Sequence, residues 1–148
     1  MLNFDGEFDV NARSEDAYNY VSDPDRIAKL VPDLISYTKI DGNNMKLTAK
    51  AGVSFIKGKF DLDLKIINDE KKENLKLEGH GKGTGASVDF TVDFNFKQND
   101  GMAHIKWNAD VNVVGSAASM GGRMIKSAAG KYINKLIDAY KQALEAGN

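Results

Sequence analysis

The two histidines, His80 and His104, are the side chains best suited to bind a metal ion or to transfer a proton near neutral pH. The 148-residue sequence contains no cysteine, so it has neither a thiolate metal site nor a thiol nucleophile. His104 lies on the polar side of an alternating segment, and His80 lies opposite a row of glycines. A zinc site needs three or four converging ligands, which two histidines at unrelated spacing do not supply. We therefore expect both histidines to face solvent and no metal to bind.

A glycine-rich segment, 81–86 (GKGTGA), formally fits the fingerprint of dinucleotide-binding proteins. That fingerprint works when a helix N-terminus follows it and receives the pyrophosphate. Here the alternation from Val88 to Phe96 predicts a strand instead. The sequence also lacks the G-x-x-x-x-G-K-[ST] motif of phosphate-binding loops. We expect no nucleotide and no other cofactor.

Carboxylates are numerous, with 21 aspartates and glutamates, but their positions do not favour catalysis. Asp61, Asp63, Asp89 and Asp93 fall on the polar side of their segments, where water surrounds them and acid–base catalysis gains little. No serine lies in a G-x-S-x-G nucleophile motif. These positions therefore favour a protein that is not an enzyme, and no catalytic residue is nominated.

The composition narrows the class of protein further. Hydrophobic residues make up 42% and charged residues 28% of the chain, which is typical of a folded globular protein. The net charge of −1 provides no basic surplus for binding nucleic acid. The N-terminus lacks the basic and apolar regions of a signal peptide, and no apolar run approaches the ~20 residues of a membrane-spanning helix. We expect one domain over residues 1–148 and a cytoplasmic location.

Hydrophobic periodicity predicts the elements that position these residues. The first segment alternates with a period of two from Phe4 to Val10, which predicts a strand. Two short helices are expected next, the first capped by Ser14 and the second by Asp23 before Pro24. Six further strands are expected between residues 34 and 114, where apolar residues share one parity in the runs 45–55, 60–66, 88–96 and 103–113.

After Gly115 the period changes to steps of three and four residues, which predicts one amphipathic helix of about 28 residues, or roughly 42 Å. Seven strands form a sheet roughly 29 Å wide, whereas a helix is only ~10–12 Å wide. The sheet must therefore curl around the helix, and the remaining space is either filled by aromatic side chains or left as a cavity. Gly79, Gly81 and Gly83 remove side chains from the inner face, either as bulges that bend the sheet or to make room for a ligand.

Several segments of the chain, with their spacing, resemble those of a known family. They are 4–8 (FDGEF), 21–28 (VSDPDRIA), 31–32 (VP), 52–60 (GVSFIKGKF), 79–85 (GHGKGTG) and 105–121 (IKWNADVNVVGSAASMG). In these residues the chain resembles the START-like (SRPBCC, helix-grip) superfamily, and more closely the carbon monoxide dehydrogenase G-subunit family. The resemblance implies a single START-like α+β domain, in which a curved antiparallel sheet of about seven strands wraps around a long C-terminal helix and an apolar cavity.

The resemblance also implies a role. It is the non-enzymatic binding of a quinone or lipid-like molecule, as an accessory or membrane-recruiting factor of a molybdenum-containing dehydrogenase. Many members of the family continue past the helix into a tail that meets the membrane, whereas this sequence stops at Asn148. Peripheral membrane contact would then lack that tail, and the cavity is the main expected functional feature.

Alternative interpretations stay open at this point. One is a protein–protein adaptor without a ligand, and another is a small cyclase or hydrolase of the same superfamily. The lysines of the last helix either contact anionic lipid or form an ordinary solvated face; they are Lys126, Lys131, Lys135 and Lys141.

The expected ligand site lies between the start of the long helix and one end of the sheet. The segment 116–122 (SAASMGG) has unusually small side chains, which permits either close approach to a ligand or tight packing on the sheet. Replacing Gly121 by leucine is then expected to block ligand uptake. The residues expected to line the site are Leu30, Val31, Phe55, Phe90, Trp107, Met120, Met124 and Ala128.

Overall fold

The computed structural model describes residues 1–51 and 57–147. The strands in these residues are β1 (Leu2–Val10), β2 (Leu34–Lys39), β3 (Asn44–Lys50), β4 (Lys57–Ile67), β5 (Asn74–Thr84), β6 (Ala86–Asn99) and β7 (Met102–Val114). The helices are α1 (Ser14–Val21), α2 (Pro24–Leu30) and α3 (Gly122–Glu145), with a short 3-10 helix, η1 (Ser116–Met120), before α3.

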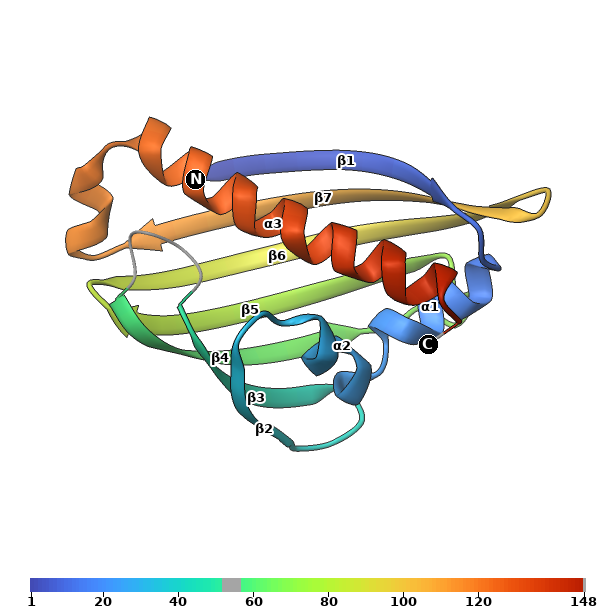
Figure 1. Cartoon of the computed structure of the whole chain (residues 1–148), viewed down its shortest axis with the longest axis horizontal. Coiled ribbons are helices and arrows are strands. Elements are labelled where there is room, and N and C mark those ends of the chain that lie inside the picture. The colour runs from blue at the N-terminus through green and yellow to red at the C-terminus, as the bar shows by residue number, and fades with distance from the viewer. Residues whose placement is uncertain (52–56, 148) are drawn as a thin grey trace.

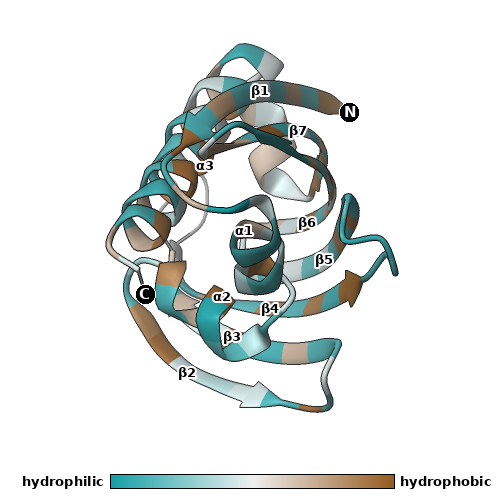
Figure 2. Ribbon diagram, turned by 90° about the vertical axis from the view of Figure 1, so that its right-hand side faces the viewer, coloured by the Kyte–Doolittle hydropathy of each residue, from teal (hydrophilic) through white to brown (hydrophobic). Residues whose placement is uncertain are grey.

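The described strands form one antiparallel sheet in the order β1-β7-β6-β5-β4-β3-β2. From β2 to β7 each strand pairs with the next along the chain, and β1 pairs with β7, with Leu2 opposite Val111 and Val10 opposite Ala103. The sheet curves around the helices, and hydrophobic and hydrophilic residues alternate along its strands (Figures 1 and 2). The predicted fold is therefore confirmed, including the two short helices after the first strand and the long C-terminal helix.

The two short helices begin in different ways. α2 begins as predicted, because the Asp23 carboxylate accepts a hydrogen bond from the Asp25 N–H at 3.0 Å. In α1, however, Arg13 occupies the capping position and Ser14 is already the first helical residue. The Ser14 N–H donates to the side-chain oxygen of Gln98 on β6, at 2.8 Å. The expectation that Ser14 caps α1 is wrong, because a neighbouring strand supplies the acceptor for the free N–H.

Replacing Asp23 by alanine is expected to lower the free energy of unfolding by about 1 kcal/mol, because the Asp25 N–H loses its acceptor. Chemical denaturation followed by circular dichroism measures this loss. Asp23→Asn is the matched control, since asparagine caps helices about as well as aspartate. An equal loss in both variants would contradict the capping role.

The long helix is shorter than predicted. α3 has 24 residues, because Gly121 adopts a φ of 97° and separates α3 from η1. A positive φ of this kind interrupts a right-handed helix. η1 is held on the sheet by the Ala117 N–H, which donates to the Gly85 carbonyl at 2.9 Å.

The larger core cluster lies around α1 and the C-terminal half of α3. Tyr140 of α3 is 2% exposed, and its hydroxyl donates to the Ala17 carbonyl of α1 at 2.5 Å. The Tyr140 ring meets Phe8 of β1 and Phe94 of β6 edge to face. The C-terminal half of α3 is thus fixed both to α1 and to the sheet.

Candidate ligand-binding site

A smaller core cluster lies under the N-terminal half of α3, and we call it the α3 N-terminal cluster. It joins η1 and the start of α3 to the inner face of the sheet. Its buried members are Ala86, Val88, Val111, Ala117 and Ile125, and its half-buried members are Leu2, Phe4, Ala51, Phe60, Phe90, Val113 and Ala128. More members are half-buried than buried, so α3 does not seal this end of the interior from solvent.

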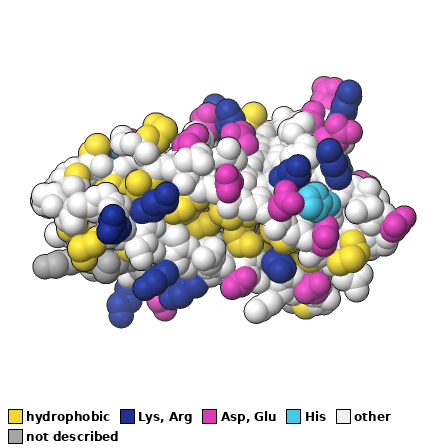
Figure 3. Space-filling view, turned by 90° about the horizontal axis from the view of Figure 1, so that it is seen from above, with side chains coloured by type: hydrophobic (Ala, Val, Ile, Leu, Met, Phe, Trp, Pro, Cys, Tyr) yellow, Lys and Arg dark blue, Asp and Glu magenta, His cyan; other side chains and the backbone are white. Residues whose placement is uncertain are grey.

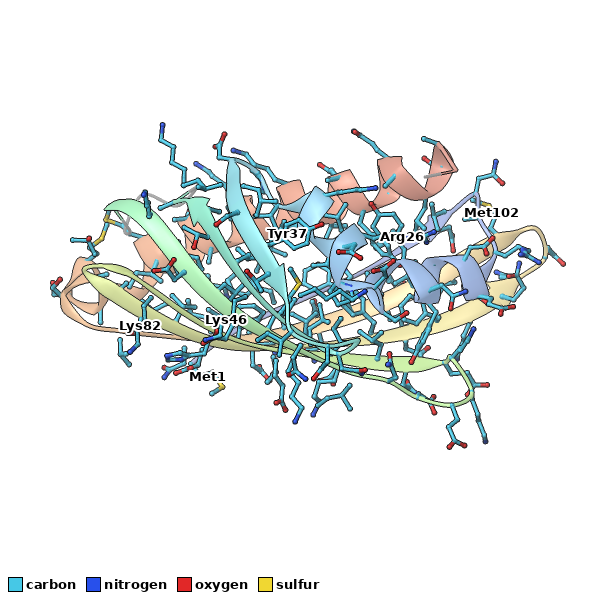
Figure 4. The ribbon with its side chains drawn as sticks, turned by 90° about the horizontal axis from the view of Figure 1, so that it is seen from below. Met1, Arg26, Tyr37, Lys46, Lys82 and Met102 are labelled. Atoms are coloured by element: carbon cyan, nitrogen blue, oxygen red, sulfur yellow. The ribbon has the colours of Figure 1, made fainter. Side chains whose placement is uncertain are left out.

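The chemistry of the α3 N-terminal cluster follows from its composition. Apart from tyrosines, the described residues bury no polar or charged side chain, so the interior around the cluster offers no buried acid, base or metal ligand. Figure 4 shows side chains occupying the space between the sheet and the helices, with Lys82 of β5 on the outer side. Such an interior binds hydrocarbon by removing it from water.

The glycines of β5 have a specific use in the structure. A Cβ at Gly79 would lie well under 3.0 Å from the ring of Phe90, and one at Gly81 would lie as close to the ring of Phe60. The two rings therefore lie directly over the bare backbone of β5. The register between β5 and β6 runs without interruption from Asn74 to Gly83, so Gly79 and Gly81 are not bulges. They make room for aromatic side chains of the neighbouring strands.

The structure brings only some of the predicted site residues together. Phe90 and Ala128 belong to the α3 N-terminal cluster. Trp107 is buried in the larger cluster, and its ring covers Gly6. A Cβ added to Gly6 would lie 2.8 Å from the ring atoms of Trp107. Leu30 and Val31 pack on the larger cluster. Met120, the last residue of η1, is 37% exposed, and Met124 in the first turn of α3 is 60% exposed. Phe55 lies outside the described residues.

Sequence reasoning missed several members of the α3 N-terminal cluster, among them Phe4, Phe60, Val111 and Ile125. Strand parity places Phe4, Phe60 and Val111 on the inner face, which was the available signal. Their meeting point depends on register, with Leu2 opposite Val111 and Phe90 opposite Val111. Hydrophobic alternation alone does not determine which inward residues share one end of the sheet.

The outer face of the sheet is polar and holds both histidines, as expected. His104 of β7 shares a hydrogen bond with Asp9 of β1 at 2.7 Å, and His80 of β5 shares one with Asp89 of β6. Within the described part of the chain, no group of three or more His, Asp and Glu residues is placed to hold a metal ion. A shallow depression of about 560 Å³ on this face is lined mainly by polar residues of β1, β5, β6 and β7. It lies on the opposite side of the sheet from the α3 N-terminal cluster.

A curved antiparallel sheet that grips a long C-terminal helix over an apolar interior defines a START-like protein. Comparison with known proteins then gives the family. Residues 6–145 match the family model for the G subunit of carbon monoxide dehydrogenase (CoxG), and the chain belongs to that family. The family and the START-like fold indicate a ligand-binding role. No curated protein matches the chain.

Solved structures share the fold at low sequence identity. A conserved protein from Geobacillus kaustophilus is 21% identical, with a TM-score of 0.86 over 97% of this chain and 95% of that chain. A START superfamily protein from Mycobacterium smegmatis is 15% identical, with a TM-score of 0.73 over 99% of each chain. A norcoclaurine synthase from Thalictrum, in complex with a transition-state analogue, is 14% identical, with a TM-score of 0.66 over 97% of this chain and 93% of that chain. The fold is therefore shared by proteins that include an enzyme.

Across residues 1–51 and 57–147, no helix is both long and apolar enough to cross a bilayer.

Proposed function

We propose that this chain binds an apolar small molecule, a quinone or a lipid-like compound, at the α3 N-terminal cluster and catalyses no reaction there. One observation carries the proposal: an all-apolar set of side chains remains half-buried under the start of α3. A ligand that covers these side chains gains about 25 cal/mol for each Å² of apolar surface removed from water. Because the described residues bury no polar or charged side chain other than tyrosine, this gain is not offset by burial of unpaired polar groups.

The family supports a proposal about the biological setting. We propose that the chain serves a molybdenum-containing dehydrogenase as an accessory or membrane-recruiting factor. The half-buried interior favours ligand binding over an adaptor without a ligand. The enzyme alternative, a cyclase or hydrolase, is supported only by fold neighbours such as the norcoclaurine synthase. The described residues bury no charged or polar side chain other than tyrosine, which favours binding over that alternative.

The start of α3 is the proposed entry for the ligand. α3 begins without a side-chain cap, and Ile125 and Ala129 are the buried residues in its first two turns. The C-terminal half, in contrast, is fixed by the buried Tyr140 and Leu144. Each half has two buried residues, but Ile125 and Ala129 together are smaller than Tyr140 and Leu144, and only Tyr140 adds a hydrogen bond, to the Ala17 carbonyl. Less buried apolar surface means a smaller free energy of local opening. We therefore expect the N-terminal end of α3 to separate from the sheet before the rest of the helix does.

Replacing Ala128 by phenylalanine is expected to weaken binding of the neutral apolar probe N-phenyl-1-naphthylamine by about ten-fold or more. Ala128 is half-buried against the α3 N-terminal cluster, so a larger side chain there occupies the space that a ligand would take. Fluorescence titration measures the dissociation constant, and native mass spectrometry of the purified protein identifies any ligand already bound.

Ser127→Phe is the matched control, because Ser127 is exposed on the same turn and the added ring is the same. Gly121→Leu, the variant suggested by the sequence, is a poorer test. Gly121 has a φ of 97° and no atom within 4 Å of a Cβ built there, so leucine would strain the backbone without filling an entrance. Equal probe binding by Ala128→Phe and wild type, or none by wild type, would contradict the proposed function.

A further inference from the structure

The segment from Val111 to Ile137 has a one-sided charge distribution. It contains Arg123, Lys126, Lys131 and Lys135 but no acidic residue, in a chain with 21 acidic residues and a net charge of −1. On the face seen in Figure 3, the end of the molecule where α3 begins carries mainly Lys and Arg side chains, whereas Asp and Glu side chains gather in the middle and toward the other end. A potential of one sign at one end attracts ligands of the opposite sign.

The four cations of this segment have no carboxylate partner within 4.0 Å among the described residues. Some lysines elsewhere in the molecule do have partners, namely Lys39, Lys46, Lys72, Lys76 and Lys106. Lys72, for example, is 3.2 Å from Glu15, and Lys39 is 3.4 Å from Asp25. The cations of α3 therefore remain available to an anion from solution.

Gly130 and Tyr132 show which elements the two sides of α3 face. A Cβ at Gly130 would lie 3.5 Å from the ring of Phe4, so that side of α3 faces β1. Tyr132 is half-buried, and α3 contacts α2. Burial and the nearby Asp33 carboxylate raise the pKa of Tyr132, which agrees with its side of α3 facing the connection between α2 and β2. Residues two apart on a helix point about 200° apart, which agrees with these opposite directions.

Only two of the four cations lie on the side with Tyr132. Ala128, which packs in the α3 N-terminal cluster, precedes Lys131 by three residues, Tyr132 by four and Lys135 by seven, and these spacings place all four on one side of a helix. Lys126 is two residues from Ala128 and lies about 200° away. Lys131 and Lys135 are exposed and lie on the same helix side as the half-buried Ala128, about one and two turns farther along α3.

We propose that the ligand is an amphiphile with an anionic head, which Lys131 and Lys135 bind while its hydrocarbon chain lies in the α3 N-terminal cluster. The inference rests on the proposed function and names the chemical class of the ligand. A charged head cannot enter an apolar interior without a large cost, so it stays at the solvent-exposed margin. Lysine acts as a compact point charge, which suits a carboxylate or a phosphate head without demanding one geometry.

The test compares oleate, oleyl phosphate and the neutral oleyl alcohol, each at concentrations where it is monomeric, as competitors of N-phenyl-1-naphthylamine. Wild type is expected to bind the two anions about ten-fold more tightly than the alcohol at low salt, because two lysines contribute. In the double variant Lys131→Gln/Lys135→Gln this preference is expected to vanish, with binding of the alcohol unchanged. Arg123→Gln/Lys126→Gln removes the same charge from the other side of α3 and is expected to keep the preference.

The outcomes separate this inference from the proposed function. Equal binding of anions and alcohol by wild type, or equal loss of preference in both double variants, would overturn the inference and leave the proposed function standing. Failure of all three competitors and of the probe to bind would overturn both. A second measurement, sedimentation with phosphatidylglycerol vesicles, tests the membrane alternative. If Lys131→Gln/Lys135→Gln reduces vesicle binding but not the preference for monomeric anions, the lysines serve a membrane surface and the inference is wrong.

Discussion

Replacing Gly79 by alanine is expected to lower the free energy of unfolding by about 1–3 kcal/mol, although the change adds only one methyl group. The reason is the position of Phe90, whose ring atoms would lie well under 3.0 Å from the new Cβ. Accommodating the methyl group requires the ring to leave its place over β5 and to press into the α3 N-terminal cluster. Urea denaturation gives the free energy, and the Gly81→Ala variant, which meets the ring of Phe60 in the same way, is expected to behave alike.

Gly42→Ala is the matched control for this prediction. No atom lies within 4 Å of a Cβ built at Gly42, so its alanine variant is expected to remain within about 0.5 kcal/mol of wild type. A double-mutant cycle of Gly79→Ala with Phe90→Ala then isolates the clash, because the penalty at Gly79 should largely disappear once the ring is gone. A Gly79→Ala protein as stable as wild type would show that the ring shifts at no cost.

The sequence predicts the fold well because one physical pattern dominates it. Alternation from Phe4 to Val10 and along the later strands marks one wet and one covered face, and a change of period after Gly115 marks the long helix. The errors lie at helix ends. The start of α1 depends on Gln98, which is 84 residues from Ser14 in the chain, and local capping preferences contain no information about such a partner.

The candidate site is less predictable for a similar reason. Phe90 and Ala128 fall in the α3 N-terminal cluster, whereas Trp107 belongs to the larger cluster beside Gly6. Phe90 and Trp107 both have inward parity in their strands, and Ala128 has an apolar position on α3. Which cluster each of them joins depends on how β1, β6 and β7 pair. The glycines of β5 illustrate the same limit. Their inward parity is visible in the sequence, but the rings that cover them come from β4 and β6.

Replacing Tyr140 by alanine is expected to lower the free energy of unfolding by about 3–5 kcal/mol, the largest effect among the variants considered. The side chain is 2% exposed, and its ring packs against Phe8, Tyr20 and Phe94. Its hydroxyl also joins α3 to α1 by the hydrogen bond to Ala17. Tyr140→Phe keeps the ring and removes only that hydrogen bond, so its expected loss is about 1 kcal/mol. Thermal or chemical denaturation measures both values.

Tyr37→Phe is the control for hydroxyl removal, because Tyr37 is 41% exposed and its hydroxyl donates to the half-buried Asp25. Its expected loss is within about 0.5 kcal/mol. Because Tyr140 fixes the C-terminal half of α3 to α1, the two halves of the helix should differ in their rates of amide hydrogen exchange. Amides near Tyr140 should exchange more slowly than amides near Ala128, because the C-terminal half of α3 opens only with the larger core cluster. Uniform exchange along α3 in wild type would mean that the helix opens as one unit, which contradicts entry at its N-terminal end.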